Sequence, residues 1–271
     1  MTRTILITGS SSGIGRASAR HFHEQGWNVI ATMRGPERET ELTALDNVLV
    51  TRLDVQDSAS ITAAVAAGLE RFGRIDVLLN NAGYGAYGLL EAIPMDKARR
   101  QFDVNVLGLL ETTKAVLPHL RANGSGTVIN ISSIGGKVTF PLGTLYHGTK
   151  FAVEGLSEAL HYELAEIGVK VKIVEPGIVD TDFGGRSFDF TNDESLAEYQ
   201  EFVRAFRTAQ TQVAAGADKP EVVAETVYRA ATDGTDRLRY PAGQGATELI
   251  AHRTATDDAT FIGGIRTQFG I

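Results

Sequence analysis

Three side chains between Ser133 and Lys150 have the types and the spacing that carbonyl chemistry requires. Tyr146 and Lys150 stand four residues apart, so on a helix they share one face and lie one turn from each other. Ser133 follows the apolar run Thr127–Ile131, which predicts a buried strand. The three polar groups could therefore converge on one carbonyl. Ser133 would donate a hydrogen bond to its oxygen, and Tyr146 would supply or remove a proton.

A tyrosine needs a suitable neighbour for this task at neutral pH, because its unperturbed pKa is about 10. The ammonium group of Lys150 is expected to favour the phenolate and so to lower the pKa of Tyr146. Each side chain also has an ordinary structural interpretation, with Ser132 and Ser133 as loop serines and Tyr146 as an aromatic residue at a helix start. His147 occupies the neighbouring position, which points away from the Tyr146–Lys150 face, and no role is assigned to it.

The N-terminal segment has the features of a phosphate-binding turn. An apolar run at Thr4–Ile7 leads into the glycine-rich stretch Thr8–Gly15, and a helical pattern follows from Arg16 to about Gln25. In this context glycines let the backbone approach a pyrophosphate, and the helix N-terminus offers free N–H groups. The spacing G-x-x-x-G-x-G differs from the G-x-G-x-x-G form, so the motif alone is also consistent with a flexible glycine loop.

The next predicted strand, Asn28–Thr32, ends at Met33 and Arg34. NAD-binding units carry an acidic residue near this point, where it holds the ribose 2′-hydroxyl. Here no carboxylate is present, and the planar guanidinium of Arg34 suits a 2′-phosphate. The sequence therefore favours NADP (NADPH) as the cofactor, with NAD as the alternative. The competing interpretation of Arg34 is an ordinary solvated loop charge.

Strands and helices alternate along the chain. Further strands are expected at Asn47–Leu53, Ile75–Leu79, Lys170–Val174 and Leu238–Tyr240, and helices at Ser58–Phe72, Asp96–Leu120 and Tyr146–Ile167. This order predicts an α/β fold, a doubly wound Rossmann-type parallel sheet of about seven strands with helices on both faces. No linker divides the chain, so residues 1–271 are expected to form a single dinucleotide-binding catalytic domain.

The pattern loosens after Thr181. Residues 183–216 predict a mobile loop and one helix that cover the substrate, and their aromatic residues are Phe183, Phe188, Phe190, Tyr199, Phe202 and Phe206. These side chains would give the pocket an apolar lining, or they would only pack this lobe. Tyr84–Gly88 is expected at the pocket rim and Gly135–Leu145 in its wall. Residues 241–271 form a C-terminal extension of uncertain structure.

The order of the motifs resembles the classical short-chain dehydrogenase/reductase family over about residues 2–240. The motifs are Thr8–Gly15, Asn80–Gly83, Asn105, Ser133, Tyr146, Lys150 and Pro176–Gly177. The resemblance implies a catalytic tetrad of Asn105, Ser133, Tyr146 and Lys150. It also implies that Lys150 holds the nicotinamide ribose and that Asn105 fixes a water that links Lys150 to solvent.

The same resemblance implies a set of cofactor-binding residues. They are Gly9, Ser11, Ser12, Gly13, Ile14, Gly15, Arg34, Asp54, Val55, Asn81, Ala82, Gly83, Tyr146, Lys150, Pro176, Gly177, Ile178 and Thr181. Arg34 matches a basic position of NADP-preferring members. Ser12 occupies a second position where such members often carry a basic residue, so the NADP signal depends on Arg34 alone.

Composition excludes several functional classes. The net charge of −7 and the pI near 5.4 argue against nucleic acid or an anionic membrane as a partner. The chain has no cysteine and no histidine pair with ligand spacing, so no metal site is expected. No apolar run approaches the length of a membrane span. We therefore expect a cytoplasmic protein, a homodimer or homotetramer built on the two long helices.

The predicted function is an NADP(H)-dependent oxidoreductase that interconverts a carbonyl (ketone or aldehyde) and a secondary or primary alcohol by hydride transfer. Its substrate would be a small molecule that is partly apolar. Two alternatives come from other classes: a non-catalytic protein that senses NAD(P), and a lyase similar to halohydrin dehalogenases. That lyase group replaces the lysine with arginine and fills the nucleotide loop with bulkier residues, whereas this chain keeps Lys150 and its loop glycines.

Overall fold

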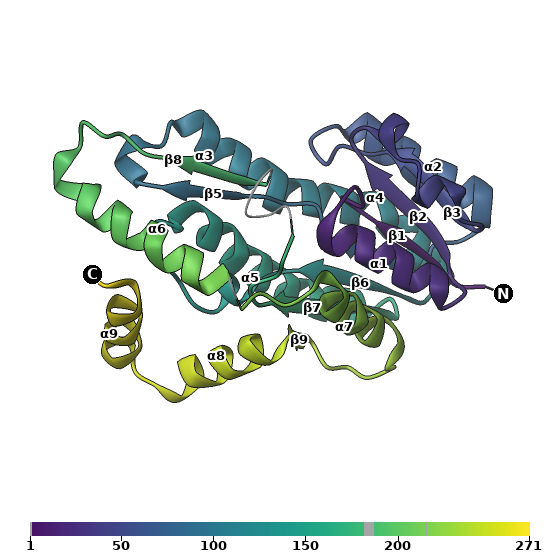
Figure 1. Cartoon of the computed structure of the whole chain (residues 1–271). Helices are drawn as coiled ribbons and strands as arrows, with labels where there is room; N and C mark the ends of the chain where they lie inside the picture. The colour runs from purple at the N-terminus through teal and green to yellow at the C-terminus, as the bar shows by residue number, and fades with distance from the viewer. Residues whose placement is uncertain (1, 182–186, 215) are drawn as a thin grey trace.

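A parallel sheet forms the centre of the molecule (Figure 1). The computed structural model describes residues 2–181, 187–214 and 216–271. Within these residues the sheet has seven strands in the order β3-β2-β1-β4-β6-β7-β9, and every neighbouring pair is parallel. The strands are β1 (Thr4–Ile7), β2 (Asn28–Met33), β3 (Val48–Arg52), β4 (Val77–Asn80), β6 (Gly126–Ile131), β7 (Val169–Pro176) and β9 (Arg239–Ala242). The predicted doubly wound sheet is confirmed.

Helices cover both faces of this sheet because its strands are apolar on both sides. On β1, Ile5 and Ile7 face one side, where they join a core with α1 (Gly13–Glu24) and α7 (Pro220–Thr232). Leu6 faces the other side. There α2 (Ser58–Phe72), α4 (Gly108–Asn123) and α5 (Thr144–Ala165) supply the packing residues. Among the described residues, no helix is long and apolar enough to cross a membrane.

The long helix expected over Asp96–Leu120 is interrupted, and this expectation was wrong in its middle. Helix α3 (Met95–Phe102) and helix α4 are joined by a π-helical segment at Asp103–Leu107. A π turn holds one residue more than an α turn, so the phase of the helix shifts across it, and Phe102 before it is exposed whereas Val106 and Leu109 are buried. The segment carries Asn105, whose placement it determines.

A second, two-stranded sheet was not predicted. Strand β5 (Gly85–Gly88) pairs in parallel with β8 (Phe188–Thr191), although both segments were expected to be loops. Glycine is disfavoured in strands, which explains why the sequence of β5 gives no strand signal. The small sheet joins the segment after β4 to the lobe that follows β7. In Figure 1 it extends to one side of the main sheet, beside α6 (Gln200–Ala214).

The C-terminal residues continue as two helices, α8 (Gln244–Ala255) and α9 (Asp258–Phe269). The ring of Phe269 stacks on Phe206 of α6 at 5.9 Å and lies 6.1 Å from Phe140. The end of the chain therefore packs against the lobe and against the segment expected to form the pocket wall (Figure 1). Phe183, one of the aromatic residues predicted for this lobe, lies outside the described residues.

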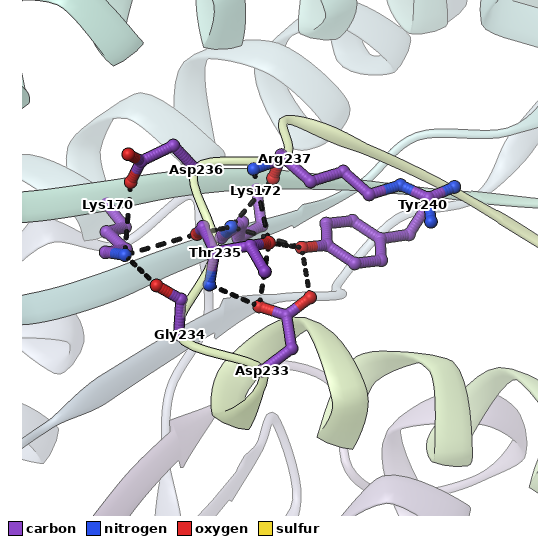
Figure 2. Close-up of polar contacts among 8 residues, drawn as sticks. All are labelled: Lys170, Lys172, Asp233, Gly234, Thr235, Asp236, Arg237 and Tyr240. Atoms are coloured by element: carbon purple, nitrogen blue, oxygen red, sulfur yellow. Dashed lines mark hydrogen bonds and ion pairs between the residues drawn. The ribbon is translucent and has the colours of Figure 1, made fainter.

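A buried polar network fastens β9 to the sheet (Figure 2). Lys172 of β7 is 1% exposed, and its Nζ donates to the carbonyls of Thr235 (2.5 Å) and Arg237 (2.7 Å) and contacts the Tyr240 hydroxyl (3.1 Å). Tyr240 in turn donates to Asp233 Oδ2 at 2.8 Å. A buried ammonium is tolerated because all three of its protons find acceptors. The network holds the start of the C-terminal extension in place.

Candidate active site

The glycine turn follows β1 and has the backbone shape that a phosphate group requires. Gly9 (φ +74°) and Gly13 (φ +53°) adopt conformations that side chains disfavour. A Cβ on Gly15 would lie 2.2 Å from the carbonyl oxygen of Gly9, so no other residue fits there. Ser12 is the N-cap of α1, and its side chain makes no capping bond. The N-terminal amides of α1 consequently favour an anion at this turn.

Two other segments close around this turn. Asn81 Nδ2 donates to the carbonyls of Thr8 (2.9 Å) and Gly9 (3.1 Å), and the hydroxyl of Thr8 accepts the amides of Asn81 and Ala82. A Cβ on Gly13 would lie 3.1 Å from Thr181 Cγ2. The structure thus brings together the glycine turn, the segment after β4 and the segment after β7, as the resemblance implied.

The remaining predicted cofactor residues lie along the same edge of the sheet. Asp54 and Val55 follow β3, with the amide of Asp54 donating to Ser60 Oγ at 2.9 Å. Pro176 ends β7, and Gly177 donates to the Ala242 carbonyl at 3.3 Å. The other members of this predicted set are the exposed Ser11, Ile14 within α1, Gly83 after β4 and the exposed Ile178 after β7. Carboxyl ends of parallel strands form the usual ligand crevice of such sheets.

Arg34 lies at the end of β2 and is exposed. Its guanidinium makes no ion pair or hydrogen bond with the residues that the structure describes. The acidic residue Glu39 is buried and is bonded to Arg16 and to the amides of Glu41 and Leu42. Its carboxylate is therefore committed to the protein, while the charge of Arg34 is available to a ligand.

The three predicted reactive groups converge at the carboxyl end of β6. Ser133 follows that strand, Tyr146 lies in the first turn of α5, and Lys150 lies one turn later; all three are buried. The hydroxyls of Ser133 and Tyr146 are hydrogen-bonded to each other. Lys150 Nζ donates to the carbonyl of Ile131 at 2.9 Å and lies 5.8 Å from the centre of the Tyr146 ring. The structure thus places the three predicted side chains at one end of β6, and their catalytic role stays a prediction.

The electrostatics of Tyr146 differ from the prediction. Burial raises the pKa of Tyr146 to about 12, although the hydrogen bond from Ser133 acts in the opposite direction. Burial also lowers the pKa of Lys150 to about 8, opposed by the charge of Glu154. The expected lowering of the Tyr146 pKa by Lys150 is therefore wrong for this structure. The reason is that desolvation penalises the phenolate, while the ammonium faces the Ile131 carbonyl.

Asn105 is buried in the π-helical segment and is fully engaged. Its Oδ1 accepts the amide of Tyr84 at 3.0 Å, and its Nδ2 donates to the Tyr84 carbonyl at 2.8 Å and to Thr149 Oγ1 at 3.2 Å. Thr149 Oγ1 donates to the carbonyl of Tyr146 at 2.7 Å. Asn105 thus connects the segment after β4 with the helix that carries Tyr146 and Lys150.

The sequence reasoning gave Asn80 and Glu175 no part in a buried polar network behind the site, and it did not single out Asn130. Asn80 Nδ2 donates to Asn130 Oδ1, and Asn130 donates to Ser157, so the amides join β4, β6 and α5. Glu175 at the end of β7 is 1% exposed, and burial, together with the charge of Glu154, raises its pKa to about 7. Asparagine and glutamate inside apolar strand patterns were the signal that could have indicated buried networks.

An aromatic cluster extends from Tyr146 into the lobe. The ring of Tyr87 on β5 lies 5.4 Å from Tyr146 and 5.0 Å from Phe188 on β8, and Phe188 stacks on Phe190 at 6.1 Å. A cleft of about 300 Å³ opens beside these rings and is lined by Phe188, Phe190, Arg207, Gln210 and Thr211. The predicted lobe aromatics Phe188 and Phe206 therefore reach the reactive tyrosine through the ring of Tyr87, and Phe206 also stacks on Phe190.

Comparison with known proteins agrees with this geometry. A family model described as short chain dehydrogenase matches residues 3–192. The chain belongs to this family. It is 45% identical over 244 residues to an uncharacterised oxidoreductase of Schizosaccharomyces pombe, covering 88% of this chain and 100% of the relative. It is therefore an oxidoreductase of the short-chain dehydrogenase/reductase family.

Solved structures of this family share the whole architecture. A short-chain dehydrogenase from Streptomyces avermitilis superposes with a TM-score of 0.83 at 34% identity, over 99% of this chain and 98% of the other. The structure of ElxO with NADP bound gives 0.75 at 28% identity, over 92% and 100%. A Burkholderia phymatum member in complex with NAD gives 0.79 at 25% identity, over 94% and 93%. A nicotinamide cofactor is common to these two complexes.

Proposed function

We propose that this protein interconverts a carbonyl compound and an alcohol by hydride transfer with NADP(H). The observation that carries the proposal is the buried, hydrogen-bonded pair of Ser133 and Tyr146, with Lys150 one turn along the same helix. The pair lies at the edge of the sheet that also carries the glycine turn, where α/β proteins bind their ligands.

The residues around the turn fit a dinucleotide. The pyrophosphate would lie against the start of α1 and the backbone of Gly9, Gly13 and Gly15. At each of these glycines a Cβ would be strained or blocked. Asp54, Val55 and residues 81–83 would border the adenosine, and residues 176–181 the nicotinamide. When bound, the nicotinamide supplies or accepts the hydride.

The preference for NADP depends on Arg34. Its exposed guanidinium is free of partners within the described residues, and a planar fork of donors matches a 2′-phosphate. Glu39 is tied to Arg16 and does not offer a carboxylate to a ribose hydroxyl. The NADP bound to ElxO supports the same assignment, and the NAD bound to the Burkholderia phymatum member represents the alternative.

The pKa directions suggest how the protein groups share the proton transfer. Because burial raises the pKa of Tyr146 to about 12, the phenol keeps its proton at neutral pH and can act as the acid in carbonyl reduction. Lys150, with a pKa lowered to about 8, can return a proton near neutral pH. Ser133 Oγ accepts the amide of Gly135, so its hydroxyl proton remains available for the substrate oxygen.

The role proposed for Asn105 is narrower than the sequence suggested. Its side chain is occupied by the backbone of Tyr84 and by Thr149. A water that links Lys150 to solvent would therefore not be held by the side chain of Asn105. The side chain would serve to hold the π-helical segment against the segment after β4.

The substrate is proposed to be a small or medium carbonyl compound with an apolar body. Tyr87, Phe188 and Phe190 form an apolar surface next to Tyr146. Planar apolar groups pack well against such rings. A homodimer or homotetramer is proposed to form through α4 and α5. The apolar side chain of Leu107 is exposed just before α4, and that of Phe151 is exposed on α5. Light scattering would measure the assembly.

The decisive experiment is Tyr146→Phe with Tyr162→Phe as its matched control on the same helix. Carbonyl reduction with NADPH should fall by about a thousandfold or more in Tyr146→Phe, because the acid is lost. Tyr162 is exposed, and its variant should behave like the wild type. Retention of most activity by Tyr146→Phe would refute the proposed chemistry.

The cofactor is tested separately by the specificity constants for NADPH and NADH before and after Arg34→Ala. A wild-type preference for NADPH that the variant loses supports the assignment, whereas a wild-type preference for NADH contradicts it. Binding of NADPH without turnover of any carbonyl or alcohol in a broad screen would instead favour a sensor. Absence of NADPH binding would favour a lyase.

A further inference from the structure

His147 is a buried, hydrogen-bonded side chain beside the site that the proposed chemistry does not use. It lies on α5 next to Tyr146 and is 3% exposed. Its Nδ1 is 3.0 Å from the carbonyl oxygen of Gly135, and its Nε2 accepts the amide of Phe140 at 2.9 Å. Its own amide donates to the carbonyl of Gly143 at 2.8 Å. One residue therefore binds three points of the segment 135–143, the pocket wall.

The partners dictate the protonation of the ring. The amide of Phe140 can only donate, so Nε2 must be unprotonated. The carbonyl of Gly135 can only accept, so the proton lies on Nδ1. The neutral Nδ1–H tautomer satisfies both bonds, whereas an imidazolium would direct an N–H group at the N–H group of Phe140. Burial lowers the pKa of His147, which favours the neutral ring.

The surroundings are shaped to this ring. A Cβ on Gly135 would lie 2.9 Å from Nδ1 of His147, and a Cβ on Gly143 would lie 2.5 Å from its Nε2. The aromatic rings of Tyr87 and Phe140 complete the enclosure at 6.0 and 5.7 Å. The imidazole is thus held between two backbone segments that only glycine allows to approach so closely.

The segment that His147 binds is also hydrogen-bonded to Ser133, the serine proposed to act on the substrate. The carbonyl of Gly135 faces His147, and the amide of Gly135 donates to Ser133 Oγ at 2.9 Å. Farther along, the carbonyl of Leu142 accepts the amide of Gly88 at 2.8 Å, and Leu142 adopts a left-handed conformation with φ +59°. A non-glycine residue in that conformation persists only where its surroundings hold it.

We propose that His147 is a positioning residue: it fixes the pocket-wall segment 135–143 so that Ser133 is aligned with Tyr146 and the ring of Phe140 stays in the wall. This inference rests on the proposed function, since it concerns the same reaction. His147 does not touch the reacting atoms; it acts through the backbone of Gly135 and Phe140. Effective catalysis depends on such alignment, since displacements of about 1 Å cost large factors in rate.

A pH signature follows. The titratable side chains in ring contact with His147, within the described residues, are Tyr87 on β5 and Tyr146 on α5, both uncharged at acidic and neutral pH. Protonation of His147 breaks its bond from the Phe140 amide and releases the segment. Turnover should therefore fall on the acid side, below the ordinary histidine pKa of about 6.5, and this limb should disappear in variants that lack the imidazole.

The test compares three variants of His147 with a control. His147→Phe keeps a ring but loses both bonds, and kcat/KM for a bulky ketone should fall by about tenfold to a hundredfold. Asn places a donor near the position of Nδ1 and Gln places an acceptor near that of Nε2, so each should restore part of the loss. His161→Phe is the matched control, because His161 lies on the same helix and its Nδ1 has no partner in the described residues.

Two readouts separate positioning from a general loss of structure. Affinity for NADPH should stay within about twofold in every variant, and kcat should fall more than KM rises for a small ketone, as expected when alignment is lost. If His147→Phe does not fold, the inference is tested with the Asn and Gln variants and with the tautomer of the wild-type imidazole. Nitrogen-15 chemical shifts of His147 should show the Nδ1–H tautomer at pH 7.

The outcomes are distinct. A folded His147→Phe with wild-type kcat/KM and an unchanged acid limb overturns the inference, and so does an Nε2–H tautomer in the wild type. Retained activity in Tyr146→Phe would overturn the proposed function itself. An inactive Tyr146→Phe together with an unaffected His147→Phe would refute the role of His147 and leave the proposed function standing.

Discussion

The two ends of the site are built differently. The cofactor end depends on backbone shape: positive φ values at Gly9 and Gly13, and a gap at Gly15 that admits no side chain. The substrate end depends on side chains, with the ring of Tyr87 packed against Tyr146 and the ring of Phe188 packed against Tyr87. Backbone shape restricts the residue type at a position, whereas a packed ring can be exchanged for another apolar group at modest cost. The first end should tolerate almost no change, and the second should change its specificity.

The sharpest contrast comes from Gly15→Ala, which should weaken NADPH binding by about a hundredfold or prevent folding. The reason is the 2.2 Å distance between the added methyl group and the carbonyl of Gly9. Gly155→Ala on α5 is the matched control, because no atom lies within 4 Å of its added methyl group. Fluorescence titration with NADPH and thermal unfolding measure both. Wild-type affinity for NADPH in Gly15→Ala would contradict the claim that the cofactor end depends on backbone shape.

At the substrate end, Phe188→Ala should raise KM for a bulky ketone by about tenfold, in keeping with the loss of one buried ring face. Affinity for NADPH and turnover of a small ketone should stay within about threefold. Tyr199→Ala in the same lobe serves as control, because its side chain is exposed. If Phe188→Ala changed the affinity for NADPH together with the KM for the bulky ketone, the predicted independence of the two ends would be wrong.

Glu175 lies where the two ends meet, at the next-to-last residue of strand β7. Burial raises its pKa from 4.5 to about 7, so the folded state binds more protons than the unfolded state between these values. Stability should therefore fall as pH rises from about 4.5 to 7. Glu175→Gln should be more stable than the wild type by about 1–3 kcal/mol at pH 8, and the difference should vanish near pH 4. Urea unfolding at both pH values would measure this, and an equal gain at both would contradict it.

The smallest effect is expected outside the site. Tyr240→Phe removes the hydroxyl that donates to Asp233 and contacts Lys172 (Figure 2), and it should cost about 1–2 kcal/mol of unfolding free energy. Turnover per folded molecule should stay unchanged, since the network lies away from Tyr146. Tyr228→Phe on α7, whose ring is packed but whose hydroxyl makes no hydrogen bond in the described residues, is the control. Loss of kcat in Tyr240→Phe would link the network to the site.

The two ends of the site also differ in how well the sequence predicted them. Strand positions were predicted because buried parallel strands are continuous apolar runs, as at Thr4–Ile7. The glycine turn and the Ser133, Tyr146 and Lys150 positions were predicted because short-range spacing determines their geometry. The glycine turn and the positions of the three reactive residues therefore depend largely on local sequence.

The features that were predicted wrongly or not at all depend on long-range contacts. Strand β5 is formed by Gly85–Gly88 only because β8, about a hundred residues later, supplies its partner. The π-helical segment at Asp103–Leu107 is supported by the bonds of Asn105 to Tyr84, which no periodicity shows. The pKa of Tyr146 was predicted in the wrong direction because burial cannot be read from one charged neighbour. His147 was set aside on helix geometry alone, which does not show the carbonyl and amide that face its ring.

The position of Phe269 has a consequence for the order in which the site is completed. Its ring stacks on Phe206 and lies beside Phe140, although it follows both of them far along the chain. During synthesis the glycine turn and its partner strands leave the ribosome long before this residue. A growing chain could therefore assemble its nucleotide cradle early, while the enclosure around the substrate is completed only after helix α9 is synthesised.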